Sequence, residues 1–523
     1  MRAEVWAWLI LLAALRGVYV FISETLAGPG QGLWFFFSSD TVQYGLIHRD
    51  LFEDGFHFAG WNISHAPEYL QMASEIFFRS LTSTLAKGHV IEALTQPILL
   101  ALALRFLLSK LWARAAFLGP LVVALILVLV AHGRGVDFIA FVWSNRHGYT
   151  AILSVLALAL MVRLLDASRR PVLLALVVGA GMASDMLFLV WFVTPALAAT
   201  LLLHRSLGGV TTRRVCLTIA LGAILGLLAF WAITPSATVG SKLEIQLALA
   251  WGALNRMVDV AFGGSIEQTA VSIVALLGFG GALIVAVKGA NTGLRVAALY
   301  AALMALGTVL AVAATAAPFR EAGYTRYLLT PQLAGLVVVT AALFLASGRF
   351  GVWALVGTLS LAVLPGLRRL PETVPPATEY YPPLVSCLDD VARRHRLEYG
   401  VADYWLAKYV TALSRNGLRV MAVTPRLDPF VDFTNIEWFL GGVGARRHDR
   451  PAYTFAILGS NRPEDPGVSP SALAPFGDPL AVETCAGYQI RVLPLDADER
   501  IRRQFRENRR IKAYYAGRGL SLP

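Results

Sequence analysis

Long apolar runs recur along the first 370 residues of this chain, and they constrain its fold more than any other feature. A helix needs about 20 mostly apolar residues to cross a bilayer. Such runs lie near residues 5–23, 90–109, 114–132, 149–165, 172–184, 186–203, 215–234, 266–288, 295–317, 327–346 and 351–369. Only 15% of the residues are charged, against roughly 25% in soluble domains. We therefore predict a polytopic α-helical membrane protein with about 11 transmembrane helices.

The stretch 172–203 is too long for one simple crossing and too short for two full ones. We expect a break at Asp185, because a charge within the membrane is costly unless it faces a cavity or a partner. The break also places the basic residues that flank the spans on one side, which the positive-inside rule makes the cytoplasm. These residues are Arg2, Lys110, Arg114, Arg163, Arg169, Arg170, Arg205, Arg213, Arg214, Lys288, Arg295 and Arg349. The N-terminus is then cytoplasmic, in what we expect to be a bacterial inner membrane.

The composition changes after residue 370, where Pro, Asp, Arg and Tyr become frequent and no apolar run is long enough to cross. We predict a transmembrane domain (1–370), a small soluble α/β domain on the periplasmic side (371–495) and a basic C-terminal tail (496–523). Helices are expected at 380–397 and 406–417, and strands at 398–405, 418–425, 452–460 and 487–494. The tail should be a solvated helix that fades into disorder. Nucleic acid is excluded as a partner, because the topology places the tail outside the cell membrane.

Three cysteines provide a separate test of the topology. Cys387 and Cys485 fall in the predicted outer domain, where disulfides can persist, whereas Cys216 lies near the cytoplasmic end of a span. A bridge between Cys387 and Cys485 and a pair of separate thiols are both open. The chain has no CxxC spacing, which argues against a structural zinc site.

The first outer loop, residues 24–89, is far longer than most connections, and long loops are often functional. Asp40 follows an aromatic run and precedes apolar residues at helical spacing, so we expect a helix on the membrane surface. A second surface helix is expected within 60–80. The acidic residues expected on the water-facing side of the first helix are Asp50, Glu53 and Asp54. Asp40 can cap this helix or serve as a functional carboxylate, and the two roles do not exclude each other.

This layout resembles the C-type (GT-C) glycosyltransferases that use polyprenyl-phosphate sugars, such as the protein mannosyltransferase and aminoarabinose transferase types. The resemblance rests on the N-terminal span, the long first outer loop with an acidic residue soon after the membrane, the many further spans and the outer C-terminal domain. It implies that Asp40 is the general base. Many protein mannosyltransferases carry an acidic pair there, where this chain has one acidic residue. The first loop is also similar to that of uncharacterised bacterial membrane proteins in Ser39-Asp40, Arg49-Asp50-Leu51-Phe52, Gly60-Trp61 and Ala66-Pro67.

The chemistry of sugar transfer sets further requirements. The acceptor hydroxyl must lose a proton as it attacks the anomeric carbon, and the charge on the leaving lipid phosphate must be met by fixed cations. Each cation taken alone could equally be a side chain that snorkels or binds a lipid headgroup. The predicted phosphate ligands in the outer loops are Arg320, Arg326, Arg146, His147 and Lys242.

Asp185 is a further candidate, because ionisable groups inside a membrane are usually functional. It could orient the acceptor, or join His65 and Glu68 around a divalent cation. A structural ion pair with Arg146 or Arg326 is the alternative. The sequence shows no dense carboxylate cluster, so we expect that no metal cofactor is required.

We predict an inverting glycosyltransferase that moves a sugar from a polyprenyl-phosphate donor to an acceptor hydroxyl on a glycan, lipid or protein at the outer face. Membrane lipids are the other expected partners. A transporter or lipid flippase is the alternative. Transporters tend to have repeated halves with interrupted helices in matching positions, and the interruption near Asp185 has no counterpart in the other half of this chain. A non-catalytic scaffold for cell-envelope assembly also stays open.

Overall fold

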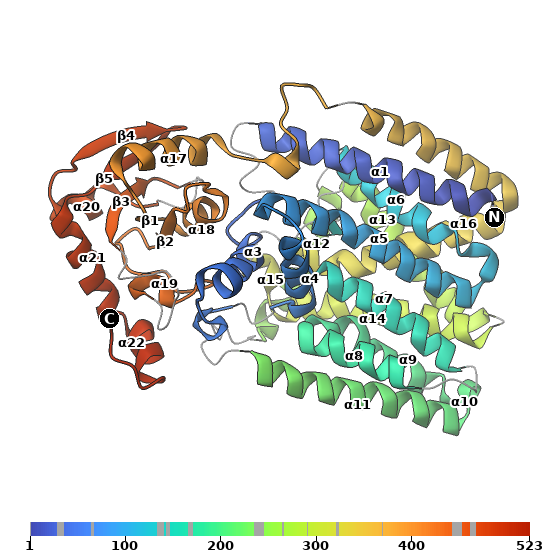
Figure 1. Ribbon diagram of the computed structural model, residues 1–523. Helices are drawn as coiled ribbons and strands as arrows, with labels where there is room; N and C mark the ends of the chain where they lie inside the picture. The colour runs from blue at the N-terminus through green and yellow to red at the C-terminus, as the bar shows by residue number, and fades with distance from the viewer. Residues whose placement is uncertain are drawn as a thin grey trace.

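The computed structural model contains a helical bundle and a smaller α/β domain packed against one end of it (Figure 1). The residues described are 2–28, 36–63, 67–132, 141–142, 147–165, 171–234, 245–263, 266–289, 291–320, 324–368, 370–441, 452–460 and 467–523. We call the end of the bundle next to the α/β domain the domain end, and the opposite end the far end.

The bundle is built from long apolar helices that run roughly alongside one another (Figure 1). Its main helices are α1 (Arg2–Ala27), α5 (Leu85–Leu111), α6 (Leu118–Ala131), α7 (Gly148–Leu165), α8 (Val172–Ser184), α9 (Thr194–Leu202), α11 (Gly209–Ile233), α12 (Ala250–Gly263), α13 (Ile266–Lys288), α14 (Thr292–Ala314) and α16 (Leu329–Val363). Short helices α10 (His204–Leu207) and α15 (Ala317–Arg320) connect them.

Eight helical segments in the described residues are long and apolar enough to cross a membrane. They are Ala3–Ala27, Leu85–Leu111, Ala113–Ala131, Gly148–Leu165, Gly209–Ile233, Gln268–Lys288, Thr292–Ala314 and Tyr324–Ala346. The remaining predicted spans coincide with shorter apolar helices, Val172–Ser184, Leu189–Leu202 and Trp353–Val363. A multi-pass membrane protein is therefore supported, while the total of about 11 crossings stays a prediction.

Helix α16 is assigned as one 35-residue element, although the sequence predicts two spans there. Just before it, Tyr327 packs against His147 at the domain end, with ring centroids 5.6 Å apart. Phe344 packs instead against Trp112 at the far end, at 4.8 Å. Arg368, after its last residue, is back at the domain end, paired with Glu24 near the end of α1. The helix therefore bends back between its two ends, and its two limbs correspond to the two predicted spans.

Glycines allow the helices of the bundle to approach closely. A Cβ atom added to Gly278 of α13 would lie 2.3 Å from the Cα of Gly335 on α16. On α11, a Cβ atom at Gly226 would lie 2.3 Å from the carbonyl oxygen of Gly179 on α8. Small residues commonly serve this purpose between membrane helices, as the sequence pattern indicates.

The α/β domain has a five-stranded sheet in the order β2-β1-β3-β5-β4. Strands β2, β1 and β3 are parallel, and β5 and β4 continue the sheet antiparallel. The strands are β1 (Tyr399–Ala402), β2 (Arg419–Ala422), β3 (Tyr453–Leu458), β4 (Ala481–Cys485) and β5 (Tyr488–Val492). Helices α17 (Pro383–His395) and α18 (Tyr404–Leu413) fall where the sequence predicts them. Strand β4 was not predicted.

Cys387 of α17 and Cys485 of β4 form a disulfide, with Cα atoms 5.5 Å apart. This settles the alternative that the sequence left open. Cys216 is a free thiol.

The basic tail is ordered, and its expected disorder is wrong. It forms α21 (Leu495–Glu507) and α22 (Arg509–Ala516), which pack on the domain. Phe505 and Tyr515 are fully buried, and the Tyr515 hydroxyl donates to the carbonyl oxygen of Gly441 at 2.7 Å. The tail belongs to the α/β domain because its aromatic residues complete the core of that domain.

The first loop contains two helical stretches, as predicted, but their polar faces differ from expectation. The first comprises α3 (Gln43–His48) and the π-helix η1 (Arg49–Asp54), and the second is α4 (Tyr69–Ser80). Asp50 and Asp54 were expected to face water and are buried instead, because they meet cations and polar groups of the α/β domain. Glu53 is partly exposed and pairs with Arg79 at 2.9 Å.

Candidate functional site

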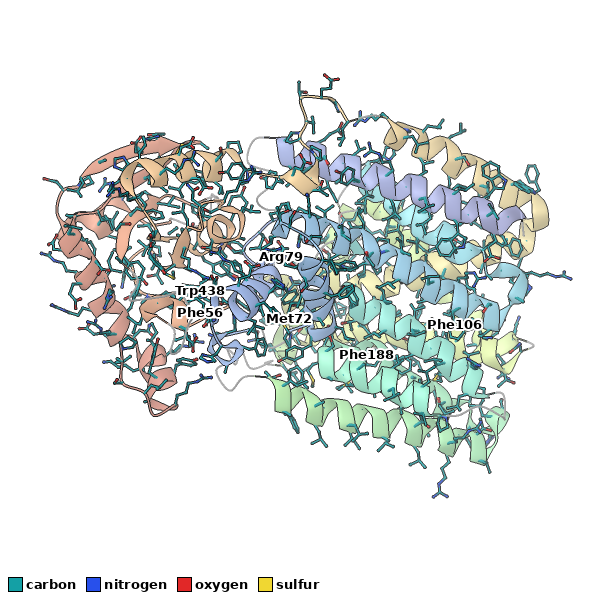
Figure 2. All side chains as sticks on the ribbon, viewed as in Figure 1. Phe56, Met72, Arg79, Phe106, Phe188 and Trp438 are labelled. Atoms are coloured by element: carbon teal, nitrogen blue, oxygen red, sulfur yellow. A yellow bond between two sulfur atoms is a disulfide. The ribbon has the colours of Figure 1, made fainter. Side chains whose placement is uncertain are left out.

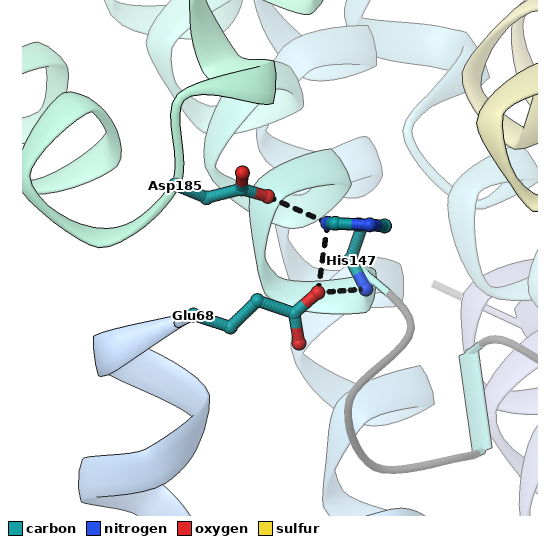
Figure 3. A group of neighbouring side chains, drawn as sticks. All are labelled: Glu68, His147 and Asp185. Carbon is teal, nitrogen blue, oxygen red and sulfur yellow. Dashed lines mark hydrogen bonds and ion pairs between the residues drawn. The ribbon is translucent and has the colours of Figure 1, made fainter. Parts of the chain in front are cut away.

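Three predicted site residues, Glu68, His147 and Asp185, meet in a buried cluster at the domain end of the bundle (Figure 3). The Nδ1 atom of His147 lies 2.7 Å from Asp185 Oδ2 and 2.8 Å from Glu68 Oε1. Glu68 also accepts a hydrogen bond from the backbone N–H of His147. Two carboxylates therefore share one imidazole, in a place screened from water.

The local backbone explains how these side chains converge. Asp185 follows the last residue of α8 in an extended conformation and precedes the π-helix η5 (Leu189–Val193), which confirms the predicted break. Thr150 of α7 donates to Asp185 Oδ2 at 2.6 Å. Glu68 and His147 both have positive φ angles, 50° and 63°. Such angles are uncommon for residues with a side chain and tend to occur at functional sites.

The imidazole of His147 partly offsets the negative charges of the two carboxylates. Burial alone would lower the pKa of His147, but the carboxylates of Asp185 and Glu68 outweigh it and raise the pKa to about 9. His147 therefore carries a proton at neutral pH. It partly neutralises the two acids that it touches.

The same three residues could hold a metal ion, since one candidate ligand atom from each lies within 4.8 Å of the others. Carboxylate oxygen and imidazole nitrogen are ligands that zinc accepts. An ion would have to displace the proton on His147, because only a neutral imidazole coordinates. The cluster thus offers either a proton-carrying ion network or a metal site.

The sequence suggested two kinds of partner for Asp185: His65 and Glu68 around a cation, or an arginine. Glu68 lies in the same cluster, as expected, and His147 contacts Asp185 there. Predicted site residues outside the described part of the chain are His65, Arg146 and Lys242, together with the side chain of Arg320.

Arg326 lies one aromatic ring away from the cluster. Its guanidinium donates to the Tyr327 hydroxyl at 2.9 Å and stacks on the Tyr327 ring at 4.9 Å. His147 packs against the same ring, with ring centroids 5.6 Å apart. Arg326 therefore lies close to the buried carboxylates of the cluster.

An open cavity of about 670 Å³ borders α12. It is lined by Gly252, Asn255, Arg256, Asp259, Val260, Gly263, Gln268 and Phe319. Met257, on the inner side of α12, packs in one apolar cluster with Tyr324 and Tyr327. The cavity and Tyr327, on whose ring Arg326 stacks, therefore border the same small core. The sequence reading did not single out Arg256.

Asp40 is half-buried and lies where the first loop meets the α/β domain. Its carboxylate accepts a hydrogen bond from the hydroxyl of Tyr404, the first residue of α18. One turn further along, Tyr44 donates to the carbonyl oxygen of Pro67 at 2.6 Å, next to Glu68. The segment that carries Asp40 therefore rests on the segment that carries Glu68.

Three of the loop motifs quoted for the family resemblance lie at the junction with the α/β domain: Ser39-Asp40, Arg49-Asp50-Leu51-Phe52 and Gly60-Trp61. Ser39 donates to the Tyr404 carbonyl at 2.6 Å, and Arg49 to the Thr411 carbonyl at 3.0 Å. Trp61 packs against Trp438 at 5.2 Å. These residues dock the loop onto the domain, which is a structural reason for their presence.

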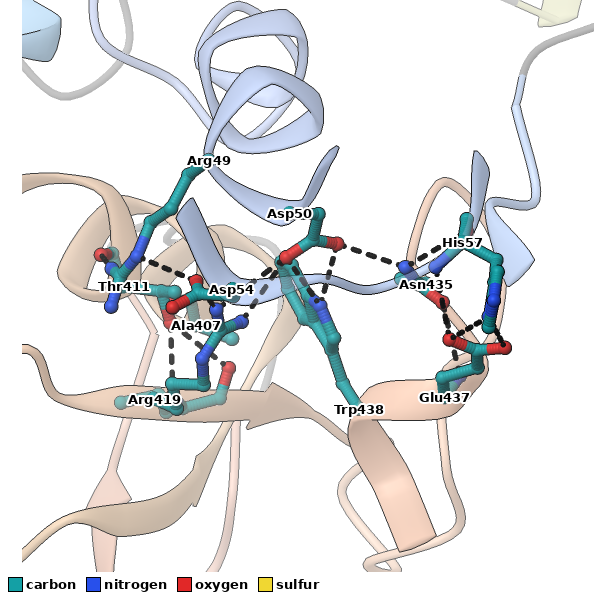
Figure 4. Close-up of polar contacts among 11 residues, drawn as sticks. Arg49, Asp50, Asp54, His57, Ala407, Thr411, Arg419, Asn435, Glu437 and Trp438 are labelled. Carbon is teal, nitrogen blue, oxygen red and sulfur yellow. Dashed lines mark hydrogen bonds and ion pairs between the residues drawn. The ribbon is translucent and has the colours of Figure 1, made fainter. Parts of the chain in front are cut away.

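A buried ion network completes this junction (Figure 4). Arg419 of β2 pairs with Asp54 and lies 3.4 Å from Asp50. The indole N–H of Trp438 donates to Asp50 at 2.8 Å, and Asn435 donates to it at the same distance. Every polar edge of the Asp50 carboxylate is therefore engaged, which fixes the loop to the domain.

Further buried polar residues lie beside the first cluster and were missed in the sequence. His89 Nδ1 is 3.2 Å from Glu75 Oε1, and its Nε2 is 3.0 Å from the Phe36 carbonyl oxygen. Glu92 accepts from Gln96 at 3.0 Å. Their signal was present, since His89 and Glu92 stand at the start of an apolar run where ionisable residues are rare.

Comparison with models of known protein families finds no match for the chain, and none of the curated proteins matches it either. The functional argument therefore depends on the site itself.

Proposed function

We propose that this chain is an integral membrane glycosyltransferase that moves a sugar from a polyprenyl-phosphate donor to an acceptor hydroxyl. Asp40 serves as general base, and the acceptor oxygen displaces the lipid phosphate with inversion at the anomeric carbon. Arg326 and Arg320 meet the charge of the leaving phosphate, with Arg146, His147 and Lys242 as further candidates. The reaction takes place at the outer face of a bacterial inner membrane, with the α/β domain in the periplasm.

One observation carries the proposal. Residues chosen for this chemistry from distant parts of the sequence, Glu68, His147, Asp185 and Arg326, converge at one end of an apolar bundle, under the loop that bears Asp40. Sugar transfer from a lipid phosphate needs a carboxylate to take the acceptor proton and cations to meet the charge of the leaving phosphate, within one crevice. The convergence supports such a site.

The cavity beside α12 supports a location for the donor headgroup. Arg256 offers a cation for the phosphate, and Asn255, Asp259 and Gln268 offer hydrogen-bonding groups for sugar hydroxyls. Trp251 of the same helix is 74% exposed, as is typical of aromatic residues at a membrane interface. A lipid-linked donor would reach this cavity from the bilayer.

A proton-coupled transporter or lipid flippase is the second candidate. The buried cluster of Glu68, His147 and Asp185 favours it, because ionisable groups within apolar bundles commonly serve as proton relays in transporters. In that case the lipid would cross the bilayer without losing its sugar.

The test is sugar transfer by Asp40→Asn in proteoliposomes, with synthetic polyprenyl-phosphate hexoses and pentoses radiolabelled in the sugar. We expect turnover to fall on the order of 10²- to 10⁴-fold, as for loss of a general base. The matched control is Asp390→Asn, since the Asp390 side chain is 54% exposed. Wild-type turnover in Asp40→Asn would remove the base assignment. Movement of the labelled lipid between leaflets without sugar transfer would favour the transporter.

A further inference from the structure

Tyr404 at the start of α18 connects the first loop to a buried lysine of the α/β domain. Its hydroxyl donates to Asp40 Oδ1 and accepts from Lys408 Nζ at 3.2 Å. The Lys408 ammonium also lies 4.6 Å from the centroid of the Tyr404 ring. Three ionisable groups thus form one continuous chain of hydrogen bonds across the junction.

The backbone around Tyr404 is held on both sides, so the chain of hydrogen bonds from Asp40 to Lys408 has a defined geometry. Ser39 donates to the carbonyl oxygens of Tyr404 and Trp405, at 2.6 and 3.0 Å. The Asp403 side chain caps α18 by accepting from the Leu406 N–H at 3.2 Å. The first turn of α18 therefore points its N-terminus toward the loop, where its dipole favours a carboxylate.

Lys408 is fully buried. Burial lowers its pKa from 10.5 to about 7, although the nearby Asp40 carboxylate acts in the opposite direction. Its ammonium donates to the Phe433 carbonyl at 2.8 Å. Arg419, on the neighbouring strand β2, is held by Asp54 and Asp50. A lysine in such a place is costly to bury and can change its charge near neutral pH.

We propose that Tyr404 and Lys408 form a proton relay that returns Asp40 to its ionised state after each sugar transfer; this inference rests on the proposed function. As the acceptor oxygen bonds to the anomeric carbon and the bond to the lipid phosphate breaks, Asp40 takes the acceptor proton. Asp40 then passes this proton to the Tyr404 oxygen while the Tyr404 hydroxyl proton moves to Lys408. Asp40 is left as a carboxylate and Lys408 as an ammonium held by the Phe433 carbonyl. Because Lys408 is fully buried, its proton leaves to water only when the junction opens transiently between turnovers.

The direction of this transfer follows from ordinary acid strengths. A carboxylic acid is a much stronger acid than an alkylammonium ion, so a protonated Asp40 gives its proton readily to the neutral amine of Lys408. The Tyr404 hydroxyl can rotate between its two partners, because a phenol both donates and accepts. Tyr404 and Lys408 act through Asp40 and need not touch the substrate. The C-terminal domain would therefore belong to the active site.

The test compares the full-length variants Tyr404→Phe and Lys408→Gln with wild type, assayed in proteoliposomes with the radiolabelled polyprenyl-phosphate sugars at several pH values. The Gln variant can still donate hydrogen bonds but cannot take up a proton. We expect the wild-type rate to rise with pH around a midpoint near 7, as Lys408 becomes neutral. Both variants should lose on the order of 10²-fold in rate together with this pH dependence, while their melting temperatures stay within a few degrees of wild type.

A second readout needs no substrate. Infrared difference spectra of a carboxyl-labelled protein should show a change at Asp40 that follows the titration of Lys408 in wild type and is absent in Tyr404→Phe. Wild-type rate and pH profile in Lys408→Gln, or an unchanged infrared response in Tyr404→Phe, would overturn the relay. Failure of the proposed function gives a different result from failure of the relay. In that case wild type would transfer no sugar, or Asp40→Asn would retain turnover, whatever the infrared spectra show.

Discussion

Arg419 in the α/β domain forms a buried ion pair with Asp54 in the first loop of the bundle, across 365 residues of sequence. The guanidinium lies between two aromatic rings, 4.9 Å from Phe56 and 5.2 Å from Trp438. Phe56 and Trp438 come from the two sides of the junction (Figure 2). One cation thus joins the loop to the domain through charge, hydrogen bonds and ring stacking.

Arg419→Met should strongly destabilise the junction. The change removes the cation that Asp50 and Asp54 share while both carboxylates stay buried, and breaking a buried pair from one side costs about 3–5 kcal/mol. Urea unfolding in detergent, followed by tryptophan fluorescence, measures this loss. The control is Arg393→Met, whose side chain is 64% exposed and pairs with Asp390, and which should cost less than about 1 kcal/mol. Equal stability of the two variants would contradict the assigned role of Arg419.

Gly60→Ala should loosen the same junction by a steric route. A Cβ atom at residue 60 would lie 2.2 Å from Asn435 Oδ1, and the Gly60 carbonyl accepts from the Ile436 N–H at 2.8 Å. The overlap forces loop and domain apart, so we expect a loss of about 1–3 kcal/mol and faster proteolysis of the loop. Gly209→Ala is the matched control, because a Cβ atom there meets nothing within 4 Å. If both variants resist protease equally well, the close approach is not needed.

The fold could largely be predicted from the sequence because its signals are local. Apolar runs of membrane length predict the helices of the bundle, and short apolar segments between helices and turns predict β1, β2, β3 and β5. Strand β4 was missed because it packs at the sheet edge and its sequence, Ala481–Cys485, has a half-exposed pattern. The ordered tail was missed because many of its residues are charged, which indicates solvent exposure, whereas two of its aromatic residues, Phe505 and Tyr515, are buried.

The candidate site was predictable only in part, because its contacts join distant segments. Asp185 was selected because it is a charge within an apolar stretch, and Glu68 and His147 because they lie in predicted outer loops. The spacing in the sequence could not show that both carboxylates contact the imidazole of His147. Asp50 was assigned to water because helical spacing says nothing about a second domain that covers the helix. Lys408 was not singled out, because a lysine on a helix is normally exposed and the sequence does not show which segments cover it.

Reduction of the disulfide should destabilise the α/β domain. The Cys387–Cys485 bond closes a loop of 98 residues, and loss of such a bond typically costs 2–5 kcal/mol. Cys387→Ser should therefore lower the melting temperature of the domain and remove the mobility shift on non-reducing gels. Cys216→Ser is the control, because Cys216 is a free thiol. A melting temperature that does not respond to dithiothreitol in wild type would contradict the bond.

Removal of divalent metals should leave the protein folded and active. The proton on His147 already compensates Glu68 and Asp185, whose oxygens lie 2.8 and 2.7 Å from it, so no ion is needed to hold the cluster together. Dialysis against EDTA, followed by melting and sugar-transfer assays, measures this. Activity that disappears with EDTA and returns with Zn²⁺, but not in Asp185→Asn, would assign a metal to the three residues.

The stability of the α/β domain should rise with pH because of Lys408. In the folded protein its pKa is lowered to about 7, while the unfolded chain keeps 10.5. Between these values the unfolded state binds one proton more than the folded state, so raising the pH favours folding. Below pH 7 both states are protonated, and the cost of burying the charge is constant.

The Lys408→Met variant isolates this contribution, since it removes the amine but keeps an unbranched apolar side chain in the same place. The difference in unfolding free energy between wild type and Lys408→Met should shift in favour of wild type by about 1.4 kcal/mol per pH unit above pH 7. Urea unfolding at pH 6, 7, 8 and 9 (roughly one-unit steps across the window) gives the slope. A difference that stays flat across this range would mean that Lys408 remains charged in the folded protein, and it would remove the neutral amine on which the relay depends.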